Sequence, residues 1–191
     1  MTFFLRHPCR ITHDYEEPRV TAFGKHGAWD LAPPHRTPIY APEAGPVYIV
    51  VAVRNELPHH DIFWPTGEWF EFSNYFSETY GVIVILVGKR YKHLWAHIDF
   101  DEAFRQLRGV GYEHIKQRTR DNYRAYVDRY HNLRTPWQVP EGHLIGKTGI
   151  AGFDDAPHVH YEVHPADRGR HERIDPATVW PEEWKTRWGG A

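Results

Sequence analysis

The chain has 191 residues, 41% of them apolar and 15% aromatic, and its 23 basic and 25 acidic residues leave a formal net charge of −2. This composition excludes a wholly disordered chain, and the balanced charge argues against a dedicated nucleic-acid-binding protein, which usually has a strongly basic face. The length fits one domain, residues 1–191, able to bury about 70% of the surface that the unfolded chain exposes.

The cysteine count and the lengths of the apolar runs bear on disulfides, a signal peptide and membrane spans. Cys9 is the one cysteine, so no intrachain disulfide is possible, and a small buried apolar role is typical of such a residue. The apolar stretch at the start is too short for a signal peptide, so we expect none. The longest apolar runs, Val47–Val53 and Val82–Val87, fall well short of the ~20 residues that span a bilayer. We therefore expect no membrane insertion and interpret both runs as buried strands.

The first half of the chain predicts short strands. Prolines separate small apolar segments over residues 26–53, which favours strand–turn–strand, and Pro46–Val53 is β-branched, as in a buried strand. Residues 54–79 follow as an aromatic-rich loop insertion. Gly81–Val87 and Lys92–Ile98 then flank a Gly-Lys-Arg turn, which predicts a hairpin.

The composition changes at the start of the second half of the chain. Residues 101–134 lack proline, are densely charged and repeat apolar residues at roughly helical spacing, which predicts a helical insertion broken near Gly109–Gly111. Strand patterns return at Gly142–Ile150 and His158–His164. The predicted fold class is mainly β, a β-rich α+β domain with a helical insertion.

Two segments carry residues with metal-binding chemistry. His26 and Asp30 are four positions apart, which places them on one face if the segment is a strand, and imidazole with carboxylate is a common zinc ligand pair. A hydrogen-bonded surface pair is the alternative, because the chain holds fifteen histidines. In His158–Val163, two histidines and a glutamate alternate with Val, Tyr and Val, so one strand face aims two imidazoles at the same space. His97 ends an apolar strand, where a satisfied core or surface histidine is the usual interpretation.

The order of these segments resembles the lysostaphin-type (LytM-like) zinc metallopeptidases, which cut peptide bonds in bacterial peptidoglycan. The segment Lys25–Val47, KHGAWDLAPPHRTPIYAPEAGPV, is similar to the family's His-x-x-x-Asp block and the segment that follows it. Tyr80–Ile98, YGVIVILVGKRYKHLWAHI, resembles its central hairpin, and Val139–Val163, VPEGHLIGKTGIAGFDDAPHVHYEV, resembles its His-x-His ending. Ile174–Pro176 resembles the short tail that often follows.

The resemblance implies a fold and a site. The fold would be an antiparallel β-sheet that lines a groove with the metal on its floor. His26, Asp30 and His160 match the three Zn²⁺ ligands, and His97 and His158 match two non-ligand catalytic histidines. Three protein ligands leave a position for water, as in catalytic zinc sites, and the resemblance implies that zinc-bound water attacks the scissile carbonyl. One histidine would orient or deprotonate the water and the other would assist the oxyanion and leaving amine, in an order that the sequence leaves open.

The resemblance also implies a function, with alternatives. The expected activity is a zinc metalloendopeptidase acting on peptidoglycan peptides, in the periplasm or cell wall, and a chain without a signal peptide suits a phage lysin or virion-associated hydrolase. A non-catalytic scaffold that keeps the fold, or a metallopeptidase with a protein substrate, are the alternatives. Glu162 is expected either to hold the second N–H of the His160 imidazole or to be a solvated strand residue. The oligomeric state and the bond cleaved are not assigned.

Overall fold

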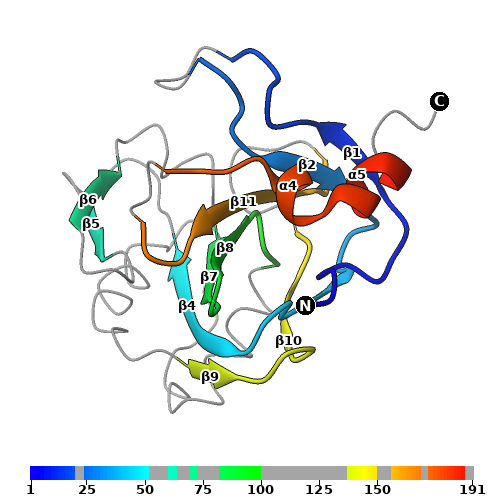
Figure 1. The fold of residues 1–191 in the computed structure, drawn as a ribbon. Coiled ribbons are helices and arrows are strands. Elements are labelled where there is room, and N and C mark those ends of the chain that lie inside the picture. Colours follow the sequence, from blue (N-terminus) through cyan, green and yellow to red (C-terminus); the bar gives the residue numbers. More distant parts are fainter. Residues whose placement is uncertain are drawn as a thin grey trace.

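The computed structural model describes residues 1–19, 24–51, 60–63, 69–72, 82–99, 137–149, 156–168 and 172–187. Strands dominate these residues, and two short helices close the described part of the chain (Figure 1). The strands are β1 Arg10–His13, β2 Trp29–Ala32, β3 Pro38–Tyr40, β4 Gly45–Val51, β5 His60–Phe63, β6 Trp69–Phe72, β7 Val82–Val87, β8 Tyr91–Ala96, β9 Trp137–Val139, β10 Leu144–Lys147 and β11 Val159–Pro165. The helices are α4 Pro176–Val179 and α5 Pro181–Arg187.

Seven strands form one antiparallel sheet in the order β1-β2-β11-β8-β7-β4-β9. The predicted hairpin is confirmed as β7 and β8, with Val87 paired to Lys92 across the turn. The predicted buried strand after Pro46 is β4, and the His-x-His segment lies on β11. The predicted mainly β fold class is therefore confirmed for the described residues.

Some elements differ from the sequence expectations. Residues 54–79 were expected to be a loop, but β5 and β6 pair with each other inside this range. Strands β1 and β9 are also additional, because three or four residues give too little periodicity to identify a strand. Helix α4 begins after Asp175, whose carboxylate accepts a hydrogen bond from the Ala177 amide at 2.8 Å, with proline at the first helical position. The predicted helical insertion 101–134 lies outside the described residues.

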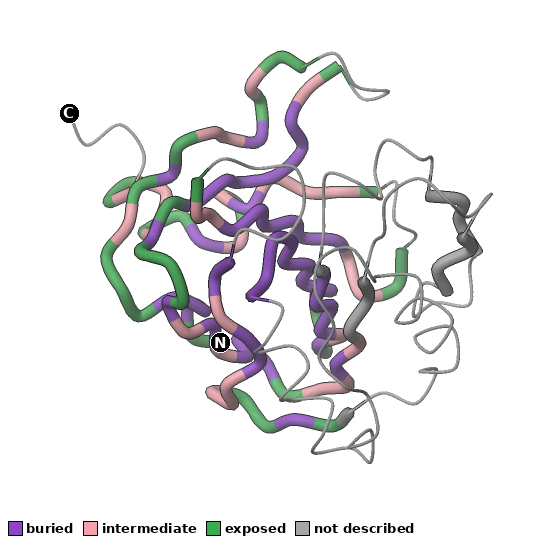
Figure 2. The backbone as a smooth tube through the Cα atoms, turned by 180° about the vertical axis from the view of Figure 1, so that it is seen from behind, coloured by how far each residue is buried: buried purple, intermediate pink, exposed green. Residues whose placement is uncertain are grey.

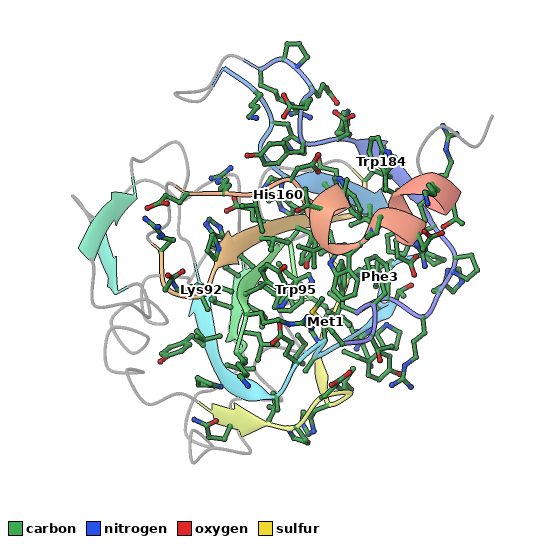
Figure 3. All side chains as sticks on the ribbon, in the orientation of Figure 1. Met1, Phe3, Lys92, Trp95, His160 and Trp184 are labelled. Carbon is green, nitrogen blue, oxygen red and sulfur yellow. The ribbon has the colours of Figure 1, made fainter. Side chains whose placement is uncertain are left out.

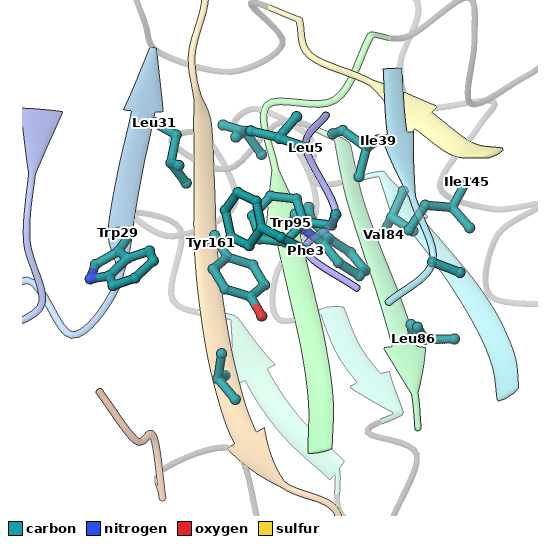
Figure 4. Packing of buried hydrophobic residues seen from close by; sticks show 14 of the residues in the cluster. Phe3, Leu5, Trp29, Leu31, Ile39, Val84, Leu86, Trp95, Ile145 and Tyr161 are labelled. Carbon is teal, nitrogen blue, oxygen red and sulfur yellow. The ribbon is translucent and has the colours of Figure 1, made fainter. Parts of the chain in front are cut away.

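One face of the main sheet forms the apolar core (Figure 4). Tyr161 on β11 faces Trp95 on β8, with ring centroids 5.7 Å apart, and Phe4 from the N-terminal segment packs 4.2 Å from the Tyr161 ring. Trp180, which links the two helices, belongs to the same cluster. Both ends of the described chain therefore cover this face, and neither helix there is long and apolar enough to cross a membrane.

A chain of hydrogen bonds between buried side chains crosses this core. The Trp180 indole N–H donates to the Tyr161 hydroxyl at 2.9 Å, and that hydroxyl is 2.8 Å from His93 Nδ1. His93 Nε2 lies 3.3 Å from Glu43, whose other carboxylate oxygen accepts the Lys89 amide of the β7–β8 turn. Burial lowers the pKa of His93 despite the Glu43 carboxylate, so its neutral form is favoured and the tyrosine hydroxyl can donate to it.

The opposite face of the same strands is buried too, but it is polar. Successive residues of a strand point to opposite faces, so His160, Glu162 and His164 lie together on the face away from Tyr161. Glu162 and His164 have no exposed surface, and the central strands are buried over most of their length (Figure 2). The ionisable residues singled out from the sequence meet on this second face.

Candidate metal centre

Three of the predicted residues converge on the polar face. His26 Nε2 lies 3.2 Å from Asp30 Oδ2 and 3.3 Å from His160 Nδ1, and His160 Nδ1 lies 2.9 Å from Asp30 Oδ1. Ligand atoms of the three residues all fall within 4.8 Å of one another, and each residue is buried. Among the residues that the structure describes, this is the cluster with the composition and spacing to hold a metal ion. Figure 3 shows His160 on β11, above the core.

The convergence has two structural causes. His160 and Asp30 are direct partners in the pairing of β11 with β2, so their side chains leave the sheet on the same face. His26 was expected in the same strand as Asp30, and this is wrong: it precedes β2. The chain turns at Gly27, which has φ +73°, and the Gly27 amide donates to the Tyr15 carbonyl at 2.9 Å. A loop, rather than strand alternation, delivers His26 to the cluster.

The hydrogen bonds of the two imidazoles fit a metal site. His26 Nδ1 is 3.0 Å from the Asp14 carbonyl, which can only accept, so Nδ1 carries a proton and the lone pair of neutral His26 is on Nε2. His160 Nε2 faces the Glu162 carboxylate at 3.2 Å, which leaves Nδ1 as the lone-pair nitrogen of neutral His160. When neutral, as metal ligands are, both imidazoles therefore point a lone pair into the cluster, and when protonated the same nitrogens donate to Asp30. Two imidazoles and one carboxylate form a donor set that suits zinc, and the residues present fit that ion.

Asp30 is held as a carboxylate by its neighbours. Burial alone would raise the pKa of Asp30, but hydrogen bonds from His13, His160 and His26 outweigh it and hold the pKa well below its usual range. His13 Nδ1 lies 3.2 Å from Asp30 Oδ2, and the same contact raises the pKa of His13. No local sequence pattern indicates a role for His13, because its approach to Asp30 depends on the pairing of β1 with β2.

Glu162 lies directly behind His160. Its side chain is fully buried, so the solvated alternative for this residue is wrong. It accepts from His164 Nε2 at 3.0 Å and from the Arg173 guanidinium at 3.0 Å, as well as from His160. Burial opposes ionisation of Glu162, but the Arg173 charge and the two histidine hydrogen bonds hold its pKa well below the usual value.

His160 sits between two carboxylates. Burial by itself would lower the pKa of His160, but hydrogen bonds and charge from Asp30 and Glu162 raise it to about 9. A metal ion that binds Nδ1 must therefore displace a proton from this imidazole near neutral pH.

The other two predicted histidines lie beside the cluster. The His97 and His158 ring centroids are 4.4 Å apart, and the His97 ring lies 6.2 Å from the His160 ring in an edge-on arrangement. His97 is buried and has φ +60°, a strained left-handed backbone for a residue other than glycine. Isolated bridges of Ile98 with Thr148 and of Gly149 with His158 bring the two segments together. The structure thus gathers all five predicted residues on one face.

Comparisons with known proteins agree on the fold. No protein-family model and no curated protein sequence matches the chain. Among solved structures, the antimicrobial peptidase lysostaphin from Staphylococcus simulans aligns with a TM-score of 0.53 and 16% identity, over 100% of this chain and 58% of that chain. LytU aligns with a TM-score of 0.51 and 19% identity, over 95% of this chain and 90% of that chain. The chain therefore has the fold of the lysostaphin-type peptidases.

Proposed function

We propose that residues 1–191 form one peptidase domain of the lysostaphin type, a zinc-dependent endopeptidase that hydrolyses peptide bonds in bacterial peptidoglycan. The observation that carries the proposal is the cluster of His26, Asp30 and His160, whose imidazole lone pairs face one another beside the carboxylate. The fold shared with lysostaphin, which is an antimicrobial peptidase, supports the choice of a peptidase over other zinc chemistry.

The three clustered residues would hold the ion as two nitrogen ligands and one oxygen ligand. Bound zinc supplies a Lewis acid that polarises the scissile carbonyl and makes water nucleophilic near neutral pH. Residues around the cluster hold the two imidazole rings in the orientation that metal binding requires. The Asp14 carbonyl orients the His26 ring, and Glu162 orients the His160 ring, so neither imidazole must reorient when the ion binds.

His97 and His158 would move the protons of the reaction. His158 Nδ1 lies 3.1 Å from the Ala156 carbonyl and must donate to it, so neutral His158 keeps its lone pair on Nε2. This tautomer suits the residue that accepts a proton from the attacking water. Protonated His97 would then donate to the oxyanion and give its proton to the leaving amine, and the proton taken up by His158 would return to His97 to complete the cycle. The strained backbone of His97 supports a functional role, because such strain persists where a site requires it.

A paired measurement tests the proposal. Zinc content of the purified protein is determined, and release of new amino groups from purified peptidoglycan sacculi is followed with and without chelator. We expect about one zinc per chain and chelator-sensitive release, and mass spectrometry of the fragments would identify the bond. Zinc without release from several wall types would favour a protein substrate or a non-catalytic scaffold. Absence of zinc would refute the ligand assignment.

The site of action follows from the same proposal. A peptidoglycan substrate places the activity in the periplasm or cell wall, which suits a phage lysin or a virion-associated hydrolase. Lysis of intact cells by externally added protein, compared with hydrolysis of isolated sacculi, distinguishes a lysin from an enzyme that needs another route to the wall.

A further inference from the structure

Arg173 is buried behind the candidate metal centre, where no sequence motif places it. Its side chain is 6% exposed, and its backbone is held at its own carbonyl and at the following residue. The Tyr15 hydroxyl donates to the Arg173 carbonyl at 3.0 Å, and the next residue, Ile174, donates its amide to Val163 on β11 at 3.0 Å. These contacts direct the Arg173 side chain along the back of the cluster.

The Arg173 guanidinium reaches the supports of two different ligands. One terminal nitrogen lies 3.0 Å from Glu162 Oε1, the same oxygen that faces His160 Nε2 at 3.2 Å. The other terminal nitrogen donates to the His26 backbone carbonyl at 3.5 Å. The guanidinium thus links the strand that carries His160 to the loop that carries His26, 134 positions earlier in the sequence.

The loop is shaped to receive this side chain. A Cβ atom at Gly27 would lie 3.1 Å from a terminal nitrogen of Arg173 and 3.4 Å from its Cδ. Gly27 also has φ +73°, so glycine serves both the backbone turn and the close approach of the arginine.

The Arg173–Glu162 contact also compensates the charge of the buried Glu162 carboxylate. Glu162 is fully buried, and an ionised carboxylate in such a place needs compensation. Its partners His160 and His164 are charged only when protonated, whereas arginine is charged at every accessible pH. When His160 is neutral, as a metal ligand must be, the Arg173 charge still balances Glu162.

We infer that Arg173 is a positioning residue for the metal centre, which fixes the Glu162 carboxylate behind His160 and the loop of His26 at once. The inference rests on the proposed metal-binding function. Its guanidinium contacts Glu162 and the His26 backbone carbonyl, so it acts through the supports of the two ligands. A purely structural ion pair is the competing explanation, and it predicts loss of stability without a specific loss of zinc affinity.

The test compares three variants of the full chain. Arg173→Met keeps most of the side-chain bulk and removes the charge, and Arg173→Lys keeps the charge but cannot bind two groups through one planar fork. Arg168→Met is the matched control, since the Arg168 side chain is 59% exposed and its guanidinium pairs with the exposed carboxylates of Asp167 and Glu172. The zinc Kd is measured by competition with a chromophoric chelator, thermal unfolding is measured in chelator, and the visible spectrum of Co²⁺-loaded protein reports ligand geometry.

Arg173→Met should weaken zinc binding by about 10- to 100-fold, the usual effect of losing a residue that orients a metal ligand, and should change the Co²⁺ spectrum. Arg173→Lys should restore part of the affinity, and Arg168→Met should match wild type. If Arg173→Met does not fold, Arg173→Lys decides, with an expected loss of several-fold. Wild-type zinc affinity in the arginine variants, with or without a lower Tm, would overturn the inference alone. A wild-type chain that binds no zinc would instead overturn the proposed function.

Discussion

The metal-free protein should lose stability as the pH rises from 6.5 to about 9, because of His160. The imidazole lies 2.9 Å from an Asp30 oxygen and 3.2 Å from a Glu162 oxygen, and its pKa is raised to about 9 from the usual 6.5. At about 1.4 kcal/mol for each tenfold change in proton affinity, this difference contributes about 3 kcal/mol to the free energy of unfolding. A raised pKa in the folded state stabilises fully below 6.5, and the contribution disappears as the pH rises through 9.

The measurement is urea unfolding in chelator at several pH values between 6 and 9.5, on wild type and on His160→Gln. The difference between the two isolates His160, because the other titrating groups are common to both. Zinc-loaded wild type should show much less of this dependence, since its His160 is already deprotonated, and zinc affinity should rise with pH. A wild-type-minus-variant difference that stays constant from pH 6.5 to 9 would refute the proposed placement of His160 between two ionised carboxylates.

Three further changes test separate parts of the structure. His160→Ala should lose most bound zinc in metal analysis, and full retention would contradict its assignment as a ligand. His97→Ala should keep zinc but reduce kcat for peptide hydrolysis by about 10²- to 10⁴-fold, the usual range for a proton-transfer group, and near-normal turnover would remove it from the mechanism. Tyr161→Phe should lower the unfolding free energy by about 2–4 kcal/mol in urea titrations, because His93 and Trp180 each lose a buried hydrogen-bond partner; a loss below about 0.5 kcal/mol would mean that the buried chain is not stabilising.

The parts of the fold that sequence predicts well are those set by local patterns. The β7–β8 hairpin follows from two apolar runs around a three-residue turn, and the two faces of β11 follow from strict alternation. The start of α4 also has a local signal, since Asp175 followed by proline is a helix N-cap pattern. The resemblance uses Ile174–Pro176 only as a match to the family's short tail, so it predicts no helix there.

The parts that sequence does not predict depend on distant partners. The Gly27 turn replaces the strand expected at His26, and its conformation is set by Tyr15 and by the packing of Arg173. Arg173 reaches His26 across 147 positions of sequence, so no periodic pattern could connect them. The charge state of Glu162 likewise depends on its partners, which is why alternation alone left two interpretations for it.

Strand β11 explains why core and site form together. Tyr161 lies between His160 and Glu162, and its hydrogen bonds to Trp180 and His93 fix the strand from the apolar side. A slip of one residue in the pairing with β8 would turn the histidine into the core and the tyrosine into the metal centre. The core therefore opposes any register in which the cluster is not assembled. The same packing that stabilises the sheet orients the donor nitrogens before an ion binds, which lowers the ordering cost of binding.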